Sequence, residues 1–288
     1  MRSEGGETDT SGMYEGAFTG YDGHRLFERR WVPAGYPRAA VVIVHGYGHH
    51  SGSFAHVAEY LRHADFGVYA FDQYGFGLAK GPRGRIPSFD AAVSDLHAYL
   101  IHIGGEIGRE PLFLLGHSYG ALVLLHYIAA HHPDVTGLVF SSPMMKLDDS
   151  VTPAKQRAVK MAARFAPWFP VARVDIEAIS REPGFAQNAR NDHLCYYGPI
   201  RARTACEMAQ ACAAAASAAR AVTTPVLIMH GTGDRIADPK GAQLLHDAAP
   251  STDKTLKYYQ GAYHELFNDS EKEAFLADLV TWLDRHTP

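Results

Sequence analysis

Uniformly apolar segments of strand length alternate with helix-like segments through most of this 288-residue chain. The strand candidates read AAVVIVHG, GVYAFD, PLFLLGH, VTGLVFSS and PVLIMHG. A strand that is apolar along its whole length must be covered on both faces, as it is in a parallel sheet flanked by helices. Parallel neighbours need long crossover connections, which the intervening helices supply. The alternation therefore predicts an α/β fold with a mostly parallel central sheet.

Further local signals complete the predicted sheet and its helices. The segments YEGAFTG and HRLFERRWV are separated by YDG, which predicts a β-hairpin with Asp22-Gly23 in its turn. From Ser88, a helix cap by residue type, apolar residues repeat with a helical period at 89, 92, 93, 96, 100 and 103. KTLKYYQ predicts the last strand, and a helix from Ser270 to His286 is expected to follow it.

One long region breaks the alternation. Between Met144 and about Thr223 the sequence contains helix-like stretches and several prolines but no strand candidate. About 80 residues are too many for a simple connection, so we expect a helical subdomain inserted into the sheet. The predicted organisation is a disordered polar tail at 1–12, a core made of 13–144 and 221–288, and a helical cap subdomain at 145–220.

Composition narrows the classes of partner. The formal net charge is −4 and no long run of one sign occurs, which argues against nucleic acid or an anionic membrane surface as the main partner. No apolar run approaches the ~20 residues that span a bilayer, and the first residues lack signal-peptide character. The three cysteines include no CxxC pair, which favours free thiols in a reducing compartment. A cytoplasmic location is expected; these features predict no oligomeric state.

A candidate nucleophile lies between a predicted strand and a predicted helix. PLFLLGHSYGALVLLHYIAAHH contains Gly116-His117-Ser118-Tyr119-Gly120, a G-x-S-x-G motif. At such a turn the serine projects from the sheet, and the glycines avoid clashes with the neighbouring backbone. The N-terminus of the helix favours negative charge that develops beside it. This context favours Ser118 as a nucleophile over the alternative, a serine that only caps the helix.

A hydroxyl nucleophile also needs hydrogen-bond donors for the oxyanion that it creates. One donor is expected from the backbone N–H of Tyr119, directly after the nucleophile. The second is expected from the N–H of Tyr47, because the loop HGYG at 45–48 follows an earlier buried strand.

The same loop allows a different interpretation, in which His45, His49 and His50 bind a metal ion. No carboxylate or cysteine stands beside these histidines in the sequence, which weakens that interpretation. The chain also contains no H-E-x-x-H motif, dinucleotide fingerprint or Walker loop. We therefore expect no metal site and no cofactor.

Serine needs a base, usually a histidine that a carboxylate holds in one tautomer. After the insertion, PVLIMHGTGDRIADP predicts a strand followed by Asp234 at its carboxyl edge, where sites collect in open α/β sheets. Asp148 or Asp149, after VTGLVFSS, is a rival acid, whereas Asp238 precedes a proline and is better suited to capping the next helix.

The base is expected to follow the last strand. His264 lies directly after KTLKYYQGAY, and the only later histidine is His286, two residues from the end of the sequence. The order along the chain is then serine, acid and histidine, as it is in α/β-hydrolases. The predicted triad is Ser118, Asp234 and His264.

Beyond these motifs, the sequence resembles the monoacylglycerol lipase branch of the α/β-hydrolases, also described as the serine-aminopeptidase-like or lysophospholipase-like group. The similarity runs from about Tyr14 to Leu283 and is carried by HGYGHHSGSF, FDQYGFGLAKGPRGRIPSF, GHSYGA, SSP, ISREPGF, NDHLCYYGPIRART and DKTLKYYQGAYHELFND. The resemblance implies an α/β-hydrolase fold and the roles given above to the triad and to the Tyr47 and Tyr119 N–H groups. Two departures are His49, where relatives usually carry an acid, and the pair Tyr119 and Ala121, where Met and Gly are common.

The resemblance also implies that residues 145–220 form a mobile cap whose apolar side chains lead an acyl chain to the serine. Packing within the cap is the alternative for each candidate side chain: Met144, Met145, Met161, Phe165, Trp168, Phe169 and Met208. The predicted function is hydrolysis of monoacylglycerols or similar single-chain esters through an acyl-enzyme. Lysophospholipase, an esterase for short-chain or aromatic esters, and a non-catalytic interaction protein are the alternatives. The expected partner is a small ester or lipid, with transient contact between the cap and a membrane or micelle.

Overall fold

The computed structural model describes residues 12–147 and 151–288. The predicted tail at 1–12 falls outside the described residues except for Gly12, and so do the rival acids Asp148 and Asp149.

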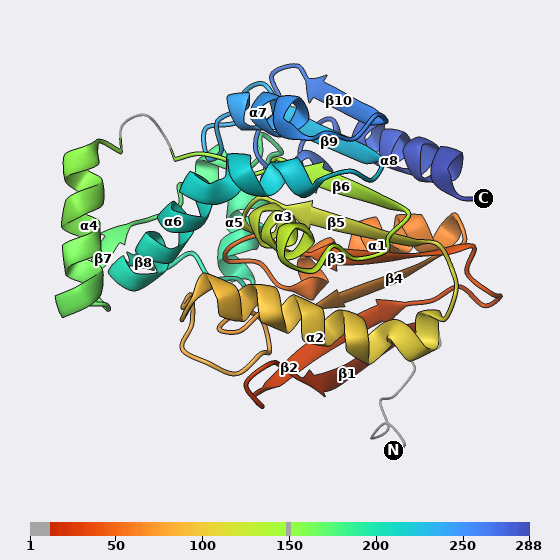
Figure 1. The fold of residues 1–288 in the computed structure, drawn as a ribbon, viewed down its shortest axis with the longest axis horizontal. Coiled ribbons are helices and arrows are strands. Elements are labelled where there is room, and N and C mark those ends of the chain that lie inside the picture. Colours follow the sequence, from red (N-terminus) through yellow and green to blue (C-terminus); the bar gives the residue numbers. More distant parts are fainter. Residues whose placement is uncertain (1–11, 148–150) are drawn as a thin grey trace.

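Eight strands form one sheet in the order β1-β2-β4-β3-β5-β6-β9-β10 (Figure 1). The neighbours from β4 to β10 in this order pair in parallel, while β1 with β2 and β2 with β4 pair antiparallel. This arrangement confirms the predicted hairpin and the mostly parallel sheet. The strands are β1 (Met13–Thr19), β2 (Arg25–Trp31), β3 (Ala39–Val44), β4 (Phe66–Phe71), β5 (Leu112–His117), β6 (Gly137–Ser141), β9 (Val226–Gly231) and β10 (Lys254–Tyr259).

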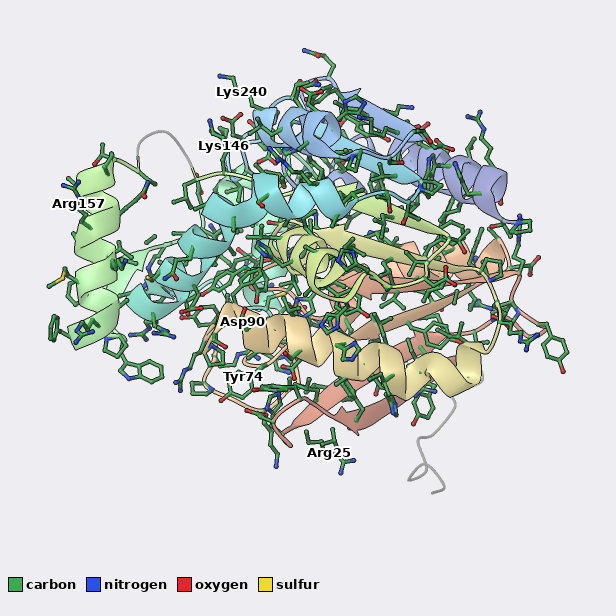
Figure 2. The ribbon with its side chains drawn as sticks, viewed as in Figure 1. Arg25, Tyr74, Asp90, Lys146, Arg157 and Lys240 are labelled. Carbon is green, nitrogen blue, oxygen red and sulfur yellow. The ribbon has the colours of Figure 1, made fainter. Side chains whose placement is uncertain are left out.

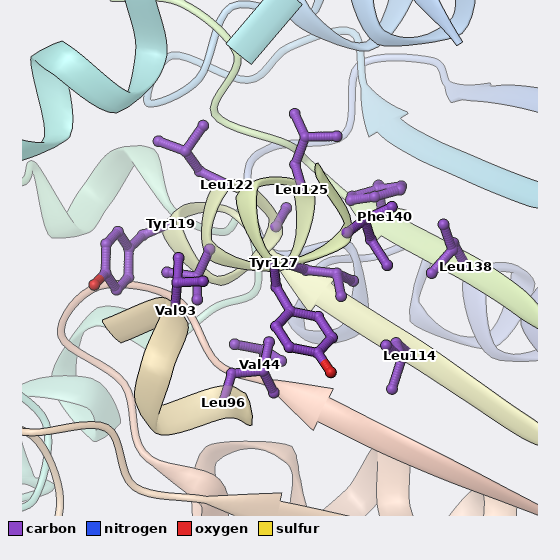
Figure 3. Close-up of a cluster of buried hydrophobic side chains, with 14 of the residues drawn as sticks. Val44, Val93, Leu96, Leu114, Tyr119, Leu122, Leu125, Tyr127, Leu138 and Phe140 are labelled. Atoms are coloured by element: carbon purple, nitrogen blue, oxygen red, sulfur yellow. The ribbon is translucent and has the colours of Figure 1, made fainter. Parts of the chain in front are cut away.

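Helices cover both faces of this sheet, because alternate residues of the central strands point to opposite sides. Val42 and Val44 of β3 join the core on one face, and Val41 and Ile43 join the core on the other. Side chains of α2 and α3 fill the first core, part of which Figure 3 shows. Side chains of α1 and α8 fill the second. The helices that connect sheet strands are α1 (Ala55–His63), α2 (Phe89–Ile107), α3 (Tyr119–His131) and α7 (Lys240–Ala248), and α8 (Lys272–His286) follows β10.

The helix that was predicted to follow Ser88 begins where the sequence indicated, and the helix predicted after the last strand begins slightly later. The Ser88 side chain accepts a hydrogen bond from the Ala91 N–H, 3.1 Å away, and α2 begins at the next residue, Phe89. The helix after β10 begins at Lys272, two residues later than expected, and ends at His286. In the described ranges, no helix combines the length and the apolar character that crossing a membrane would require.

The region between β6 and β9 contains three α-helices, two short 3₁₀ helices (η) and two short strands among its described residues. Its elements are α4 (Pro153–Phe165), β7 (Pro170–Ala172), η2 (Ile176–Ala178), α5 (Phe185–Asn191), β8 (Ile200–Arg201), α6 (Ala202–Ala218) and η3 (Ala219–Ala221). The expectation of no strand between Met144 and about Thr223 was therefore wrong. β7 and β8 pair antiparallel over two or three residues, which is too short for a hydrophobic alternation, and β7 begins with Pro170.

Candidate active site

Ser118 lies at the turn between β5 and α3, in a backbone conformation that few side chains adopt. Its φ is +53° and its ψ is −118°, and only 7% of its surface is exposed. A Cβ atom added to Gly116 would lie 2.6 Å from the Ala121 Cα, and one added to Gly120 would lie 2.1 Å from the Val44 carbonyl oxygen. The two glycines of the motif are therefore required by close backbone packing, as the sequence predicted.

The loop after β3 packs directly against this turn. A Cβ atom added to Gly46 would lie 3.3 Å from the Ser118 Cβ, so the segment that carries Tyr47 borders the serine. The Tyr47 ring is fixed by a hydrogen bond from its hydroxyl to the Gly84 carbonyl, 3.0 Å away, and by edge contact with Phe76. Neither the Tyr47 N–H nor the Tyr119 N–H donates a hydrogen bond to another group of the described residues. Both donors are thus free to bind a ligand oxygen near Ser118.

Asp234 and His264 meet at the same edge of the sheet. His264 Nδ1 lies 2.7 Å from Asp234 Oδ2, and the two residues are 4% and 7% exposed. The other carboxylate oxygen, Oδ1, accepts hydrogen bonds from the N–H groups of Ile236 and Ala237 at 2.8 and 3.0 Å. All these donors fix the carboxylate, so that its Oδ2 orients the imidazole of His264.

Backbone contacts bring the two loops together. The Gly233 N–H donates to the Ala262 carbonyl at 2.9 Å, and the Gly261 N–H donates to the Thr232 hydroxyl at 2.7 Å. Gly261 has a φ of +75°, a conformation that favours glycine and turns the chain out of β10. This turn places His264 opposite Asp234.

The ionisation of the pair follows from its surroundings. Burial opposes the charge on Asp234, but the positive charge and hydrogen bond of His264 and the hydrogen bond of His230 outweigh burial and hold the pKa of the carboxyl well below its usual range. Burial alone would lower the pKa of His264, and the charge and hydrogen bond of Asp234 raise it instead. Asp234 is therefore ionised, and an imidazolium at His264 is stabilised.

Ser118 and His264 each form a hydrogen bond with a residue at the end of β6. Among the described residues, no hydrogen bond joins the Ser118 hydroxyl to His264. The Ser118 N–H donates to the Ser141 carbonyl at 3.0 Å, and the Ser142 hydroxyl donates to the His264 carbonyl at 2.7 Å. The two residues are thus held by adjacent positions at the end of β6. Catalytic hydrogen bonds of this kind often form only when substrate is bound.

The third candidate acid has a structural role. Asp238 Oδ1 accepts a hydrogen bond from the N–H of Lys240, the first residue of α7, at 2.9 Å. Its other oxygen lies 2.9 Å from the Lys146 ammonium. Lys146 and Lys240 lie on the same side of the molecule in Figure 2. As expected, the Asp238 carboxylate accepts a hydrogen bond from a backbone N–H at the start of the next helix, α7.

Sequence reasoning did not identify His230, the residue before Gly231 in β9. Its Nε2 lies 2.9 Å from Asp234 Oδ2 and 3.2 Å from the Ala237 carbonyl. Because both neighbours are acceptors, Nε2 carries the proton and donates to the carboxylate. A polar residue at the end of an otherwise apolar strand, in MHG, was the signal that could have revealed this contact.

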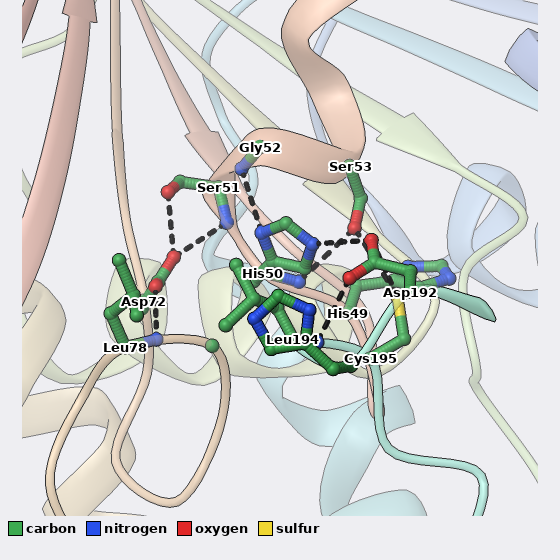
Figure 4. A network of polar contacts seen from close by, with 12 residues as sticks. His49, His50, Ser51, Gly52, Ser53, Asp72, Leu78, Asp192, Leu194 and Cys195 are labelled. Carbon is green, nitrogen blue, oxygen red and sulfur yellow. Dashed lines mark hydrogen bonds and ion pairs between the residues drawn. The ribbon is translucent and has the colours of Figure 1, made fainter. Parts of the chain in front are cut away.

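The three histidines of the HGYGHH loop do not form a common ligand set. His45 binds Gln73, whose N–H donates to His45 Nε2 at 3.0 Å. His49 Nε2 lies 2.7 Å from Glu265 Oε1. His50 Nε2 lies 3.0 Å from Asp192 Oδ2, a contact that Figure 4 shows. The alternative in which His45, His49 and His50 together bind one metal ion finds no support in this geometry.

The apolar residues predicted to line an acyl path fall into two groups. Met145 and Met208 are buried and Met144 is half-buried, and all three belong to the core or pack against it. The others lie on or just after α4 with roughly half to three quarters of their surface exposed: Met161 57%, Phe165 72%, Trp168 49% and Phe169 59%. Within the exposed group, the Arg85 guanidinium lies over the Trp168 ring, 4.7 Å from its centroid, and leaves about half of that side chain exposed.

Comparisons with known proteins agree with this architecture. A family model described as serine aminopeptidase, S33, matches residues 35–271. The chain is similar to the monoacylglycerol lipase of Mycolicibacterium smegmatis, with 32% identity over 94% of this chain and 97% of that protein. It is similar to the monoglyceride lipase of Rattus norvegicus, with 31% identity over 91% of this chain and 88% of that protein. The crystal structure of Paleococcus ferrophilus monoacylglycerol lipase superposes with a TM-score of 0.81 and 31% identity, over 91% of this chain and 99% of that one.

Proposed function

Because the chain belongs to the serine aminopeptidase, S33, family and is a hydrolase with the α/β-hydrolase fold, we propose that it cleaves monoacylglycerols or similar single-chain esters at Ser118. The observation that carries the proposal is the 2.7 Å contact between His264 Nδ1 and Asp234 Oδ2. This contact lies at the sheet edge that also holds Ser118 in its strained turn.

In the proposed mechanism, the Ser118 hydroxyl attacks the ester carbonyl carbon and its proton passes to Nε2 of His264. Asp234 holds the imidazole in the tautomer that accepts this proton and stabilises the imidazolium that forms. The oxyanion is bound by the N–H groups of Tyr47 and Tyr119. His264 then protonates the departing alcohol, which leaves an acyl-enzyme on Ser118.

The second half of the reaction uses the same groups with water in place of the alcohol. His264 removes a proton from the water, whose oxygen attacks the acyl carbon. Collapse of the second tetrahedral intermediate releases the fatty acid and returns the proton to the Ser118 oxygen. No group beyond the side chains of the triad and the two N–H donors is needed for the atoms and charges to balance.

We further propose that residues 145–220 act as a cap over this site, with 13–144 and 221–288 as the catalytic core. The exposed apolar side chains of Met161, Phe165, Trp168 and Phe169 support this role, because they are gathered on and just after α4, and grouped apolar exposure is typical of a surface that meets an apolar partner. A long acyl chain, or the lipid surface that contains it, matches that chemistry. The cap would then contact membranes or micelles transiently.

The test is turnover of an ester panel by the wild-type enzyme and by Ser118→Ala. The panel contains monoacylglycerols, lysophosphatidylcholine, hydroxycinnamate esters and a short-chain ester. We expect hydrolysis of monoacylglycerols by the wild type and no detectable turnover by Ser118→Ala. Ser217→Ala, which removes an exposed hydroxyl from α6, is the matched control and keeps full activity.

The panel also separates the alternatives. A clear preference for lysophosphatidylcholine or for hydroxycinnamate esters would replace the proposed substrate class and leave the mechanism in place. Undiminished turnover by Ser118→Ala would reject the mechanism. Absence of turnover on every ester, in a correctly folded wild type, would favour the non-catalytic interaction protein.

A further inference from the structure

A second cluster of polar side chains lies behind the proposed nucleophile. His49 comes from the loop after β3, His117 is the last residue of β5, and Glu265 follows His264. One ligand atom from each lies within 4.8 Å of the others. All three residues are buried, with exposed fractions of 5%, 0% and 1%. The cluster therefore joins the three segments that carry Tyr47, Ser118 and His264.

Atoms of this cluster lack the partners that buried polar atoms normally have. Within the described chain, His49 Nδ1 and His117 Nε2 accept or donate no hydrogen bond. Glu265 Oε1 lies 2.7 Å from His49 Nε2 and has no contact that meets full hydrogen-bond geometry. Buried polar atoms without partners are rare in folded proteins, and several in one place call for a bound ion or water.

Two of the three residues, His117 and Glu265, also have a partner on the atom that points away from the cluster. His117 Nδ1 lies 3.3 Å from the Ser141 hydroxyl, which leaves Nε2 directed at the cluster. Glu265 Oε2 accepts a hydrogen bond from the Asn268 amide at 2.8 Å, which leaves Oε1 facing His49. Metal-binding histidines and carboxylates usually have such secondary partners on the atom that does not bind the metal. The rings of Phe54 and Phe267 border the histidines, and the His264 ring lies 4.9 Å from the His117 ring, measured between centroids.

We propose that His49, His117 and Glu265 form a binding site for a divalent transition-metal ion of the zinc type. Two imidazole nitrogens and one carboxylate oxygen are a donor set that Zn²⁺ accepts, with water as the fourth ligand. The ion would link the loop after β3, the nucleophile turn and the loop of His264. This site differs from the set of His45, His49 and His50, because only His49 is common to both and its partners come from distant segments.

A neighbouring cluster of possible metal ligands lacks a nitrogen lone pair that could bind an ion. His50, Asp192 and Cys195 also lie close together, as Figure 4 shows. His50 Nδ1, however, accepts a hydrogen bond from the Gly52 N–H at 3.1 Å, so its Nε2 carries the proton and donates to Asp192. The nitrogen that faces the cluster has no lone pair for a metal ion. We therefore assign the ion to the cluster of His49, His117 and Glu265.

The experiment measures zinc bound to the full-length enzyme. The protein is treated with a chelator, equilibrated with Zn²⁺ and desalted. Its zinc content is then measured by inductively coupled plasma mass spectrometry. The site variants are His49→Gln and Glu265→Gln. The matched controls are Asp192→Asn, in the neighbouring cluster, and His126→Gln, whose side chain contacts the Ala211 carbonyl. Far-UV circular dichroism verifies that each variant is folded. If Glu265→Gln does not fold, the zinc content of His49→Gln alone decides the test.

We expect about one zinc ion per chain in the wild type and both controls, and less than a tenth of that in the site variants. Co²⁺ in place of zinc should give visible absorption bands in the wild type that both site variants lack. Zinc should also raise the melting temperature of the wild type and leave that of His49→Gln unchanged, because only the native site binds it. A wild type that retains no zinc after desalting would overturn the proposal, and so would site variants that retain as much zinc as the wild type. None of these readouts depends on ester turnover.

Discussion

Helices α3 and α4 both have 13 residues and apolar side chains, but the molecule uses them in opposite ways. In α3, which begins directly after Ser118, nine residues are buried. In α4 only Ala163 is buried, while Phe165 at its end is 72% exposed. α3 is fixed by packing on the sheet and on its neighbours, whereas α4 packs mainly against α6. Packing thus holds the proposed nucleophile rigidly and leaves the apolar surface of the proposed cap free for a partner.

The largest effect of a substitution is expected in the well-packed region that holds Ser118 and His264. Replacing His264 by Gln should lower kcat for a monoacylglycerol by roughly 10⁴- to 10⁶-fold, because the attacking hydroxyl loses its base. The melting temperature should change little, since Gln keeps a donor toward Asp234. Steady-state kinetics and thermal unfolding measure the two effects.

His246→Gln serves as the control for that variant. His246 lies in α7 and its side chain contacts only the carboxylate of the neighbouring Asp247 among the described residues. We expect wild-type kcat from it. Activity of His264→Gln within tenfold of the wild type would mean that another group acts as base.

A smaller effect is expected for substitutions on the exposed apolar surface of α4. The double variant Met161→Gln, Phe165→Gln removes exposed apolar surface from α4 and keeps residues that favour a helix. We expect kcat/KM for a long-chain monoacylglycerol to fall about tenfold, which corresponds to about 1.4 kcal/mol of lost transition-state binding. The kcat/KM for a butyrate ester should stay within twofold of the wild type, because a short chain does not reach α4.

Leu244→Gln is the matched control for that variant, since Leu244 is 45% exposed on α7, outside the proposed cap. It should leave both substrates unaffected. Equal losses on long and short esters in the α4 variant would point to a general defect and would remove the argument for a cap that selects acyl chains.

Much of the rigid region could be predicted from the sequence, because its signals are local. The buried strands are continuous apolar runs, and the hairpin turn carries Asp22-Gly23. Ser118 stands out because an apolar strand leads into its motif and an apolar helix leads out. Asp234 and His264 follow from their positions after β9 and β10.

The contacts that escaped prediction depend on how the chain folds and not on a local sequence pattern. His49 and Glu265 approach only because the loops after β3 and β10 reach the same sheet edge. His230 and Asp234 share a segment, yet their contact depends on how the chain turns after Gly231. β7 and β8 are joined by backbone pairing over two or three residues, which leaves no side-chain pattern in the sequence.

Covalent labelling of the active-site serine tests whether Ser118 is the nucleophile. The enzyme is treated with a fluorophosphonate, digested, and analysed by peptide mass spectrometry. We expect one adduct per chain, on the peptide that contains Ser118, and no adduct on Ser118→Ala. An adduct on another residue, or equal labelling of Ser118→Ala, would contradict the assignment.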